Sequence, residues 1–354
     1  MRESPPSPKR SWKLALYPLI RRALLLLPPE NVHAWTLAAL RTAHRCNLLA
    51  EHVDFNPSSQ QVMGLNFPNR VGLAAGFDKN GDCIDALGSL GFGFLEIGTV
   101  TPGAQPGNAK PRLFRVPRSA ALVNRMGFPN AGATYVQARL ARRGYRGICG
   151  VNIAKNAATA IDRAIDDYVA AFRTLAPHAD YVVANVSSPN TASLRLLQDV
   201  RRLRPILEAL LQERLAMYER CGRRIPLLVK VAPDLSDQQL EELALLLHEL
   251  AIDGVVATNT TLQRPPGTDA NHLEGGLSGA PLHRLSLMTI RALRDLMGPS
   301  FTIIGVGGIS CAADAHAAVQ AGADLVQLYT GLIYRGPKLI REVIAATADH
   351  EDPA

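Results

Sequence analysis

The sequence predicts an α/β protein: a (β/α)8 TIM barrel with a small N-terminal two-helix extension. From residue 70 onward, eight short apolar runs alternate with helical stretches in the 354-residue chain. The runs are apolar at nearly every position rather than at alternate positions, which is typical of parallel strands buried on both faces. Eight strand–helix units in series favour a closed barrel, because an open sheet rarely needs so many in unbroken alternation.

The expected elements follow from these runs in order. The strands are expected at Val71–Gly76, Phe92–Val100, Ile148–Ile153, Tyr181–Val186, Leu227–Val231, Gly254–Ala257, Phe301–Val306 and Leu325–Tyr329. The helices are expected at Cys83–Leu90, Ala131–Arg143, Ala160–Ala176, Leu194–Cys221, Asp237–Ala251, Leu282–Met297, Ala312–Ala321 and Pro337–Ala346. Ser236 before "DQQLEE" and Ser310 before "CAADA" are typical helix-starting residues.

The composition indicates how the chain is divided into domains. Hydrophobic residues make up 47% of the chain and charged residues 19%, which suits one large core without global disorder. We expect residues 1–10 to form a disordered tail, 11–50 a helical segment, and 51–354 the barrel. The five cysteines are scattered and include no CxxC pair, which indicates reduced thiols and no metal centre.

The net charge of +7 leaves several partners open: nucleic acid, an anionic membrane face, an acidic substrate, or none beyond solvent. The N-terminal stretch "WKLALYPLIRRALLLLPPENVHAW" is interrupted by Arg21 and Arg22 and falls far short of the ~20 apolar residues of a membrane-spanning helix. An amphipathic helix lying on a membrane surface fits the pattern, with Leu16, Leu19, Ile20 and Leu24–Leu27 beside Lys13, Arg21 and Arg22. A helix packed on the barrel fits it as well.

Each expected strand ends in polar or glycine-rich residues. In order, these ends supply Lys79, Thr99, Asn152 with Lys155, Asn185 with "SSPN", Lys230, "TNTT" from Thr258, "GVGGI" from Gly305, and "YTG" from Tyr329. Barrel enzymes carry their chemistry at the C-terminal ends of the strands, so these residues predict one polar pocket at one mouth.

Three features indicate what this pocket binds. Gly307, Gly308 and the helix that Ser310 opens predict a phosphate site, although glycines there also serve packing alone. Lys230 in the apolar strand "LLVKVAP" needs an anion, either an internal acidic residue or the pyrimidine end of a reduced flavin. A set of asparagines suits a ring edge that alternates N–H and C=O, although a turn or cap explains any one of them better: Asn124, Asn185, Asn190 and Asn259.

The motifs in order resemble one family. "AAGFDKNG", "EIGTVTP", "PGNAKPRLFR", "NRMGFPN", "NVSSPNT", "KVAPDLS", "GVVATNTT", "GGLSG", "IIGVGGI" and "LVQLYTG" are similar to those of dihydroorotate dehydrogenases, and more narrowly of the quinone-dependent, membrane-associated class. The resemblance runs from about Leu16 to the last expected helix. It implies oxidation of (S)-dihydroorotate to orotate in de novo pyrimidine (UMP) biosynthesis, with one FMN per subunit and a membrane quinone, ubiquinone or menaquinone, as electron acceptor.

The resemblance also implies residue roles. Ser188, rather than Ser187, would remove the C5 proton while the C6 hydride passes to FMN N5. FMN contacts are expected from Ala75, Gly76, Phe77, Asp78, Lys79, Thr99, Asn152, Asn185, Lys230, Thr258, Gly279, Gly307, Gly308, Tyr329 and Thr330. Substrate contacts are expected from Lys79, Asn124, Arg125, Met126, Gly127, Phe128, Asn185, Asn190, Asn259 and Thr260. A serine is a far weaker base than the cysteine of other classes, so it needs a closed, dry site. The loop around Ser188 is the expected lid, and Thr261–Gly275 is a second candidate.

By the same resemblance, the N-terminal helices would form an apolar mouth for quinone. The protein would be a peripheral monomer on the cytoplasmic side of the cell membrane, without a nucleic-acid partner. Two departures from the family pattern concern rates and loop motion: Ala192-Ser193 where proline-glycine is usual, and Ala154 where glycine is common and where we expect the flavin nearby.

Three alternatives remain weaker. A soluble fumarate-linked dihydroorotate dehydrogenase conflicts with the serine and with the N-terminal segment. A flavin-dependent tRNA-dihydrouridine synthase is expected to carry an additional RNA-binding domain. A binding or scaffold protein that had lost catalysis is expected to lose Ser188, Lys79 or Lys230, and all three are present.

Overall fold

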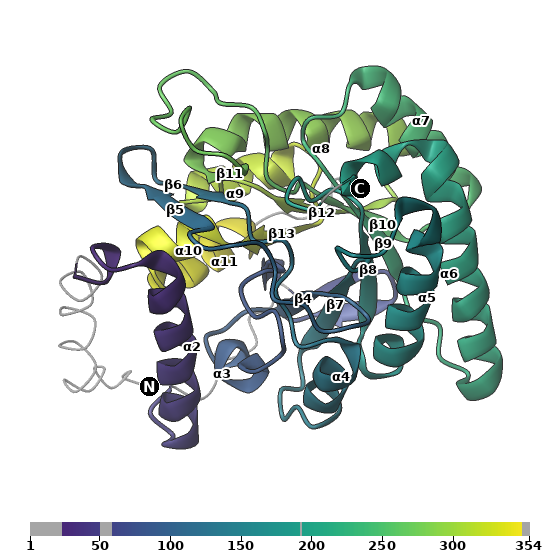
Figure 1. The fold of residues 1–354 in the computed structure, drawn as a ribbon, viewed down its shortest axis with the longest axis horizontal. Helices are drawn as coiled ribbons and strands as arrows, with labels where there is room; N and C mark the ends of the chain where they lie inside the picture. Colours follow the sequence, from purple (N-terminus) through teal and green to yellow (C-terminus); the bar gives the residue numbers. More distant parts are fainter. Residues whose placement is uncertain (1–22, 50–58, 192, 349–354) are drawn as a thin grey trace, which may run out of the picture.

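The structure, a computed structural model, describes residues 23–49, 59–191 and 193–348. Its centre is a closed barrel of eight parallel strands in the order β10-β12-β13-β3-β4-β7-β8-β9, which confirms the predicted fold (Figure 1). The strands are β3 (Val71–Leu73), β4 (Phe94–Val100), β7 (Ile148–Ile153), β8 (Tyr181–Asn185), β9 (Leu227–Val231), β10 (Gly254–Ala257), β12 (Thr302–Val306) and β13 (Leu325–Leu328). Nearly all of their residues are buried, because helices cover the outer face and side chains fill the inside.

Helices follow the strands around the barrel. They are α3 (Ile84–Gly88), α4 (Ala133–Ala141), α5 (Ala164–Leu175), α6 (Val200–Cys221), α7 (Asp237–Glu249), α8 (His283–Met297), α9 (Ala312–Gln320) and α11 (Lys338–Ala348). Ser236 caps α7 as expected, in a reciprocal capping box with Gln239. The expected helix Leu194–Cys221 is instead divided, because Asp199 adopts an extended conformation and caps α6 after a short 3-10 turn.

The start of α9 corrects one expectation. Cys311, not Ser310, is its N-cap residue. The carboxylate of Asp314 accepts hydrogen bonds from the backbone N–H groups of both Ser310 and Cys311 and from the Ser310 hydroxyl, at 2.7–3.1 Å. Asp314 and Cys311 therefore form a capping box at the start of α9.

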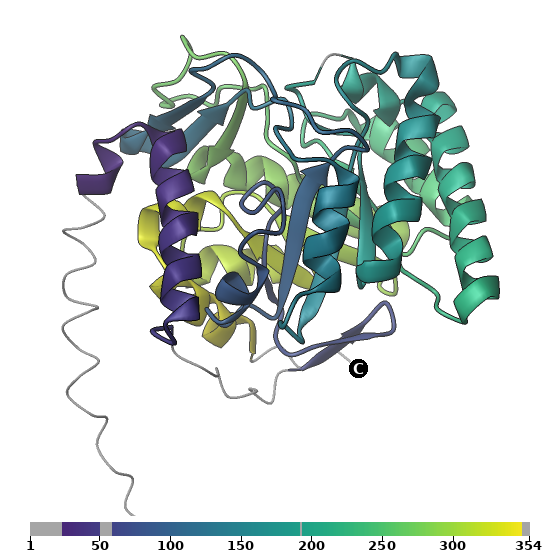
Figure 2. The same cartoon turned by 60° about the horizontal axis from the view of Figure 1, so that its bottom comes forward.

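A hairpin closes the far end of the barrel. Strands β1 (Gln60–Val62) and β2 (Leu65–Phe67) pair just before β3 and lie across the end opposite the mouth (Figure 2). The buried Phe67 ring meets Phe94 edge-to-face at 5.3 Å, and Phe94 meets Tyr181 at 6.5 Å. These rings fill the bottom of the barrel and leave the other end for the site.

A second sheet stands at the mouth. It consists of β5 (Leu113–Val116), β6 (Ala121–Asn124) and β11 (Gly276–Gly279), with β6 antiparallel to both neighbours. Because β5 and β6 follow β4 and β11 follows β10, this sheet joins two segments that are distant in sequence. A short helix α10 (Thr330–Arg335) follows β13 directly. The hairpin, this sheet and α10 were not predicted from the sequence, since the strands and α10 are each shorter than a clear periodic pattern requires.

The N-terminal helix α2 (Pro29–Arg45) stands beside the barrel, next to α3 and the β5 strand (Figures 1 and 2). Arg112, which precedes β5, donates to the Glu30 carboxylate through Nε and Nη2, the latter at 2.7 Å. Arg115 of β5 donates to the carbonyl oxygens of Leu25 and Leu27. No helix within the described ranges is long and apolar enough to cross a membrane. The expected tail 1–10 and the predicted surface residues Lys13, Leu16, Leu19, Ile20, Arg21 and Arg22 lie outside the described residues.

Candidate active site

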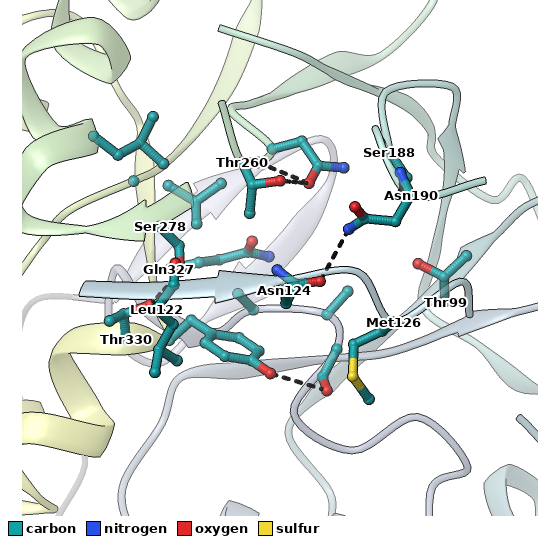
Figure 3. Close-up of a pocket in the computed structure, with 18 of the residues that line it drawn as sticks. Thr99, Leu122, Asn124, Met126, Ser188, Asn190, Thr260, Ser278, Gln327 and Thr330 are labelled. Carbon is teal, nitrogen blue, oxygen red and sulfur yellow. Dashed lines mark hydrogen bonds between the residues drawn. The ribbon is translucent and has the colours of Figure 1, made fainter. Parts of the chain in front are cut away.

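A cavity opens at the mouth of the barrel (Figure 3). Each barrel strand except β7 contributes to its wall, either with a residue of the strand or with one from the segment that directly follows that strand. Most of the predicted site residues line it: Ala75, Gly76, Lys79, Thr99, Asn124, Met126, Gly127, Phe128, Asn185, Ser188, Asn190, Lys230, Thr258, Asn259, Thr260, Gly279, Gly307, Gly308, Tyr329 and Thr330. Parallel strands bring their carboxyl ends to one edge, which is why residues far apart in sequence meet here.

Four predicted residues do not line the cavity. Asp78 accepts hydrogen bonds from the backbone N–H groups of Asp82 and Cys83, so it shapes a turn. Arg125 reaches outward to the Pro111 carbonyl and to Glu274. The Phe77 ring lies behind the wall, edge-on to His33 at 5.2 Å and to Tyr329 at 5.8 Å. Asn152 is fully buried below the cavity.

Below the cavity lies a buried acid that the sequence analysis missed. Glu96 of β4 is 0% exposed. Its Oε1 accepts from Asn152 Nδ2 at 2.8 Å, and its Oε2 accepts from Gln327 Nε2 at 2.6 Å and from the Tyr181 hydroxyl at 3.4 Å. A single acidic residue in the otherwise apolar run "FLEIG" was the available signal.

Glu96 is also the internal acidic residue near Lys230. Lys230 Nζ lies 4.0 Å from Glu96 Oε1, so the internal partner exists, but at a distance longer than a hydrogen bond. Burial lowers the pKa of Lys230, while the charge of Glu96 acts in the opposite direction. Because Lys230 also lines the cavity, its ammonium group lies between Glu96 in the barrel interior and the space that a ligand would fill.

Glu96 fixes the orientation of the amides above it. An ionised carboxylate can only accept, so Asn152 must turn its Nδ2 toward Glu96 and its Oδ1 away. That Oδ1 accepts from Thr99 Oγ1 at 2.6 Å and from Asn185 Nδ2 at 3.0 Å. Asn185 Oδ1 then accepts from the Ser187 hydroxyl and from Asn259 Nδ2. A chain of oriented amides therefore runs from the barrel centre to the cavity wall.

The two serines of "NVSSPNT" have different surroundings. The Ser187 hydroxyl is buried in the amide chain, where it donates to Asn185 and accepts from Asn259 Nδ2 at 3.0 Å. Ser188 lines the cavity (Figure 3), and among the described residues its Oγ has one hydrogen bond, a long one of 3.3 Å that it accepts from the Asn190 N–H. Ser188 is 5% exposed, so its hydroxyl faces the cavity and little solvent.

The substrate end of the cavity joins two loops. Asn190 Nδ2 donates to Asn124 Oδ1 at 3.0 Å across the opening (Figure 3). Asn108 Nδ2 donates to the carbonyl oxygens of both Arg125 and Asn190, which ties the "NRMGF" loop to the serine loop, residues 186–191. Gln105 Nε2 donates to the Gly127 and Phe128 carbonyls.

The long stretch Thr261–Gly275 is held closely. Arg264 Nη2 donates to the carbonyl oxygens of Leu273 and Gly275 at 2.8 Å, and its Nε donates to Ala270. Ala270 is fully buried in a small apolar cluster with the β6–β11 sheet. Arg264 therefore braces the stretch internally, and Ala270 packs it against the sheet at the mouth.

At the opposite end, two glycines line the cavity with their backbone. Gly307 and Gly308 have φ values of 145° and 72°, and a Cβ would lie 2.8 Å from Ser286 on Gly307 and 2.6 Å from His283 on Gly308, so close packing against α8 requires glycine at both positions. Their backbone and the turn at Thr330 and Gly331 line this end, and the Thr330 hydroxyl bonds with Ser278 Oγ at 2.9 Å. Ser310 does not line the cavity, and its backbone N–H and hydroxyl both donate to Asp314, so the expected contribution of Ser310 is not found.

Two residues of α2, also missed from sequence, reach the cavity: Glu30 and His33. Burial, followed by the nearby charge of Lys79, lowers the pKa of His33 to about 4. Lys79 Nζ donates to the Gly76 carbonyl at 2.6 Å, and burial lowers its pKa to about 8. The other unpredicted lining residues are Ala74, Leu113, Leu122, Ser278, Leu282, Val306, Ile309, Gln327 and Gly331.

Comparison with known proteins decides the family. The sequence profile described as "Dihydroorotate dehydrogenase" matches residues 58–349. The chain belongs to the dihydroorotate dehydrogenase family. A relative from Bordetella parapertussis named "Dihydroorotate dehydrogenase (quinone)" is 51% identical over 338 residues, 94% of this chain and 97% of the relative. A relative of the same name from Chromobacterium violaceum is 50% identical over 340 residues, 95% of this chain and 98% of its own.

Solved structures agree with this assignment. The crystal structure of a dihydroorotate dehydrogenase from Eimeria tenella in complex with ferulenol has a TM-score of 0.84 and 36% identity, covering 92% of this chain and 93% of that one. Its ligand-free form has a TM-score of 0.81 and 37% identity, covering 88% and 92%. Dihydroorotate dehydrogenases are flavin-dependent, which suits a cavity with a buried cation and a glycine-lined end.

The two departures from the dihydroorotate dehydrogenase pattern have different structural meanings. Ser193 has a φ of 59°, a left-handed conformation that glycine adopts at less cost, which explains the usual glycine. Ala192 lies outside the described residues. Ala154 is fully buried in the core packing and does not line the cavity, so the expected closeness to the flavin is not found.

Proposed function

We propose that this chain oxidises (S)-dihydroorotate to orotate through bound FMN and passes the electrons to a membrane quinone, in de novo pyrimidine biosynthesis. The observation that carries the proposal is the meeting in one cavity of Ser188, the Lys230 ammonium group and the asparagines Asn124, Asn185, Asn190 and Asn259. The relatives named for quinone-dependent dihydroorotate dehydrogenase activity support the same reading.

The residues present fit FMN. Gly307, Gly308 and the turn at Thr330 and Gly331 line one end of the cavity with backbone, whose N–H groups suit a phosphate. Lys230 offers a buried cation to the pyrimidine end of the ring, and Thr99, Asn185 and Thr258 offer polar groups around it. When bound, FMN accepts a hydride from dihydroorotate and later gives up the electrons to quinone.

The asparagines suit the substrate ring. Dihydroorotate carries alternating N–H and C=O groups, and an amide side chain both donates and accepts. Binding would replace the Asn190–Asn124 hydrogen bond with bonds to the substrate, since both amides face the cavity. Lys79, together with the backbone of residues 126–128, suits the carboxylate of dihydroorotate.

Ser188 would take the C5 proton. Its Oγ accepts rather than donates its one hydrogen bond to the chain described here, so its proton is free to orient and its lone pair can face the substrate. A hydroxyl is a weak base in water, and the low exposure of Ser188 supports proton transfer in a site closed to solvent. Ser187 would instead hold Asn185 and Asn259 in position.

The α2 side of the cavity suits the quinone. Glu30 and His33 line the cavity there, and Leu26, Leu27 and Trp35 beside them expose 88%, 41% and 54% of their surface. Such exposed apolar side chains fit a membrane interface. We infer a peripheral protein on the cytoplasmic face of the membrane, acting as a monomer, whose quinone enters along α2.

The test is an anaerobic half-reaction experiment. The purified holoenzyme is mixed with dihydroorotate, and the visible flavin absorbance is followed. Bleaching, followed by recovery with a short-chain ubiquinone but not with fumarate, is the expected result. Recovery with fumarate alone would contradict the quinone assignment, and absence of bound flavin or of bleaching would contradict the oxidation of dihydroorotate.

A further inference from the structure

Gln327 of β13 carries an unused hydrogen-bond acceptor at the cavity wall. Gln327 is 1% exposed and lines the cavity. Its Nε2 donates to Glu96 Oε2 at 2.6 Å, while its Oε1 is buried and has no hydrogen-bond partner among the described residues. Figure 3 draws this side chain among those around the cavity. A buried amide oxygen without a partner costs free energy, so the position calls for an explanation.

The orientation of this amide is set by its neighbour. Glu96 is buried 4.0 Å from the Lys230 ammonium group and can only accept hydrogen bonds as a carboxylate. The Gln327 amide therefore cannot turn its oxygen toward Glu96 without placing two acceptors together. Glu96 acts as a positioning residue: it holds Nε2 and leaves Oε1 available to a ligand.

The ligand chemistry follows from the two groups that flank Glu96. Lys230 offers a cation and Gln327 offers an acceptor, and both line the cavity. On the pyrimidine edge of a flavin, the N1–C2=O group, which becomes negative on reduction, is adjacent to the N3–H donor. A cation beside an acceptor is complementary to that sequence of atoms.

We propose that Gln327 is a further flavin-binding residue, whose amide oxygen accepts the N3–H hydrogen bond of FMN while Glu96 holds the amide in that orientation. This inference rests on the proposed function, because it requires FMN in the cavity. It gives Gln327 a role in binding and gives the acid inside the barrel a function.

The decisive experiment replaces the donor on the ligand. Holoenzyme carrying FMN and holoenzyme reconstituted with 3-methyl-FMN are diluted, and flavin release is followed by the return of flavin fluorescence. The wild-type protein is expected to release 3-methyl-FMN about tenfold faster, because the methyl group removes the hydrogen bond and leaves Oε1 without a partner. Equal release of the two flavins would overturn the proposal without any mutation.

Variants then locate the effect. Gln327→Leu keeps the side-chain size and removes the acceptor, so FMN release is expected to rise about tenfold and the preference for FMN over 3-methyl-FMN to fall to about one. Glu96→Gln is expected to weaken the same preference, since a neutral amide no longer dictates how Gln327 turns. A preference that survives in Gln327→Leu would overturn the proposal.

Gln198→Leu is the matched control. Gln198 is also a buried glutamine, and its Oε1 accepts from the Ala232 N–H at 2.9 Å, but it does not line the cavity. Its replacement is expected to leave the flavin preference unchanged. An equal loss of preference in Gln198→Leu would indicate a general disturbance of the barrel and contradict the specific role of Gln327. A wild-type protein that binds neither flavin would instead refute the proposed function itself.

Discussion

Arg195 Nη1 donates to Asp234 Oδ2 at 2.6 Å, and the same guanidinium group donates to the carbonyl oxygens of Ser187 at 3.0 Å and Thr260 at 2.7 Å. Asp234 in turn accepts from the Thr261 hydroxyl. One planar side chain therefore connects the loops that follow β8, β9 and β10, two of which carry cavity residues. The position of Ser188 depends on this connection as well as on its own strand.

Replacing Arg195 with leucine should lower stability and slow flavin reduction together. The Arg195 and Asp234 side chains are only 20% and 17% exposed, so losing the guanidinium leaves a poorly solvated carboxylate. We expect the free energy of unfolding to fall by about 2–3 kcal/mol. Urea unfolding measures it. Arg195→Lys should recover only part of the loss, because its ammonium group can pair with Asp234 but cannot reach all three acceptors at once. Equal losses in Arg195→Leu and Arg195→Lys would argue that the charge alone contributes nothing to this connection.

Ser188→Ala should slow flavin reduction by dihydroorotate without releasing the flavin. General-base catalysis typically contributes about 10²–10⁴-fold, and we expect a loss in that range in stopped-flow single-turnover experiments. Ser187→Ala is the matched control. It removes a hydrogen bond to Asn185, so it should mainly weaken substrate binding. A larger rate loss in Ser187→Ala than in Ser188→Ala would reverse the assignment of the base.

The affinity for dihydroorotate should fall as the pH rises above about 8. Burial lowers the pKa of Lys79 to about 8, so its cation is present below that pH and lost above it. An anionic substrate favours the charged form, and the KM should rise by up to about tenfold per pH unit once free Lys79 is neutral. Steady-state kinetics between pH 6 and 10 measures it. Lys79→Gln should give a high KM that is independent of pH; a pH dependence that persists in this variant would exclude Lys79 as its source.

Glu30→Gln should impair the quinone half-reaction selectively. Glu30 lines the cavity and joins α2 to Arg112 through a bidentate contact, whose loss weakens the docking of the helix. We expect slower flavin reoxidation by quinone and an unchanged rate of flavin reduction, both read from flavin absorbance. Arg173→Gln, which breaks an exposed ion pair with Glu213 on the outer helices, is the control and should leave both rates unchanged. Slower flavin reduction by dihydroorotate in Glu30→Gln would contradict the assignment of the α2 side of the cavity to the quinone.

Ser193→Gly should stabilise the protein slightly. Ser193 has a φ of 59°, a conformation that costs an L residue about 1–2 kcal/mol, of which glycine loses part through its greater freedom in the unfolded chain. We expect a net gain of about 0.5–1 kcal/mol in urea unfolding. Ser193→Ala keeps the Cβ and should give no gain; a gain of the same size from alanine would rule out backbone strain as the cause.

The barrel was predictable because its signal is repeated along the chain. Each strand is a short, mostly apolar run, and polar residues gather toward its C-terminal end, as with Asn185 at the end of β8 and Lys230 near the end of β9. Parallel strands share one direction, so these ends had to meet at one mouth. The set of cavity residues around Ser188 followed from the motifs and from that single geometric rule.

The tertiary structure decided the contacts that no local pattern encodes. Glu96 and Gln327 are 231 residues apart, and their pairing depends on how β4 and β13 face each other inside the closed barrel. The approach of Glu30 and His33 to the cavity depends on where α2 docks beside the barrel. Sequence by itself determined which residues end at the mouth, since the apolar pattern of each strand and the alternation of strands with helices are read along the chain. Side-chain orientation inside the barrel came only from the fold, because it is set by partners that are distant along the chain.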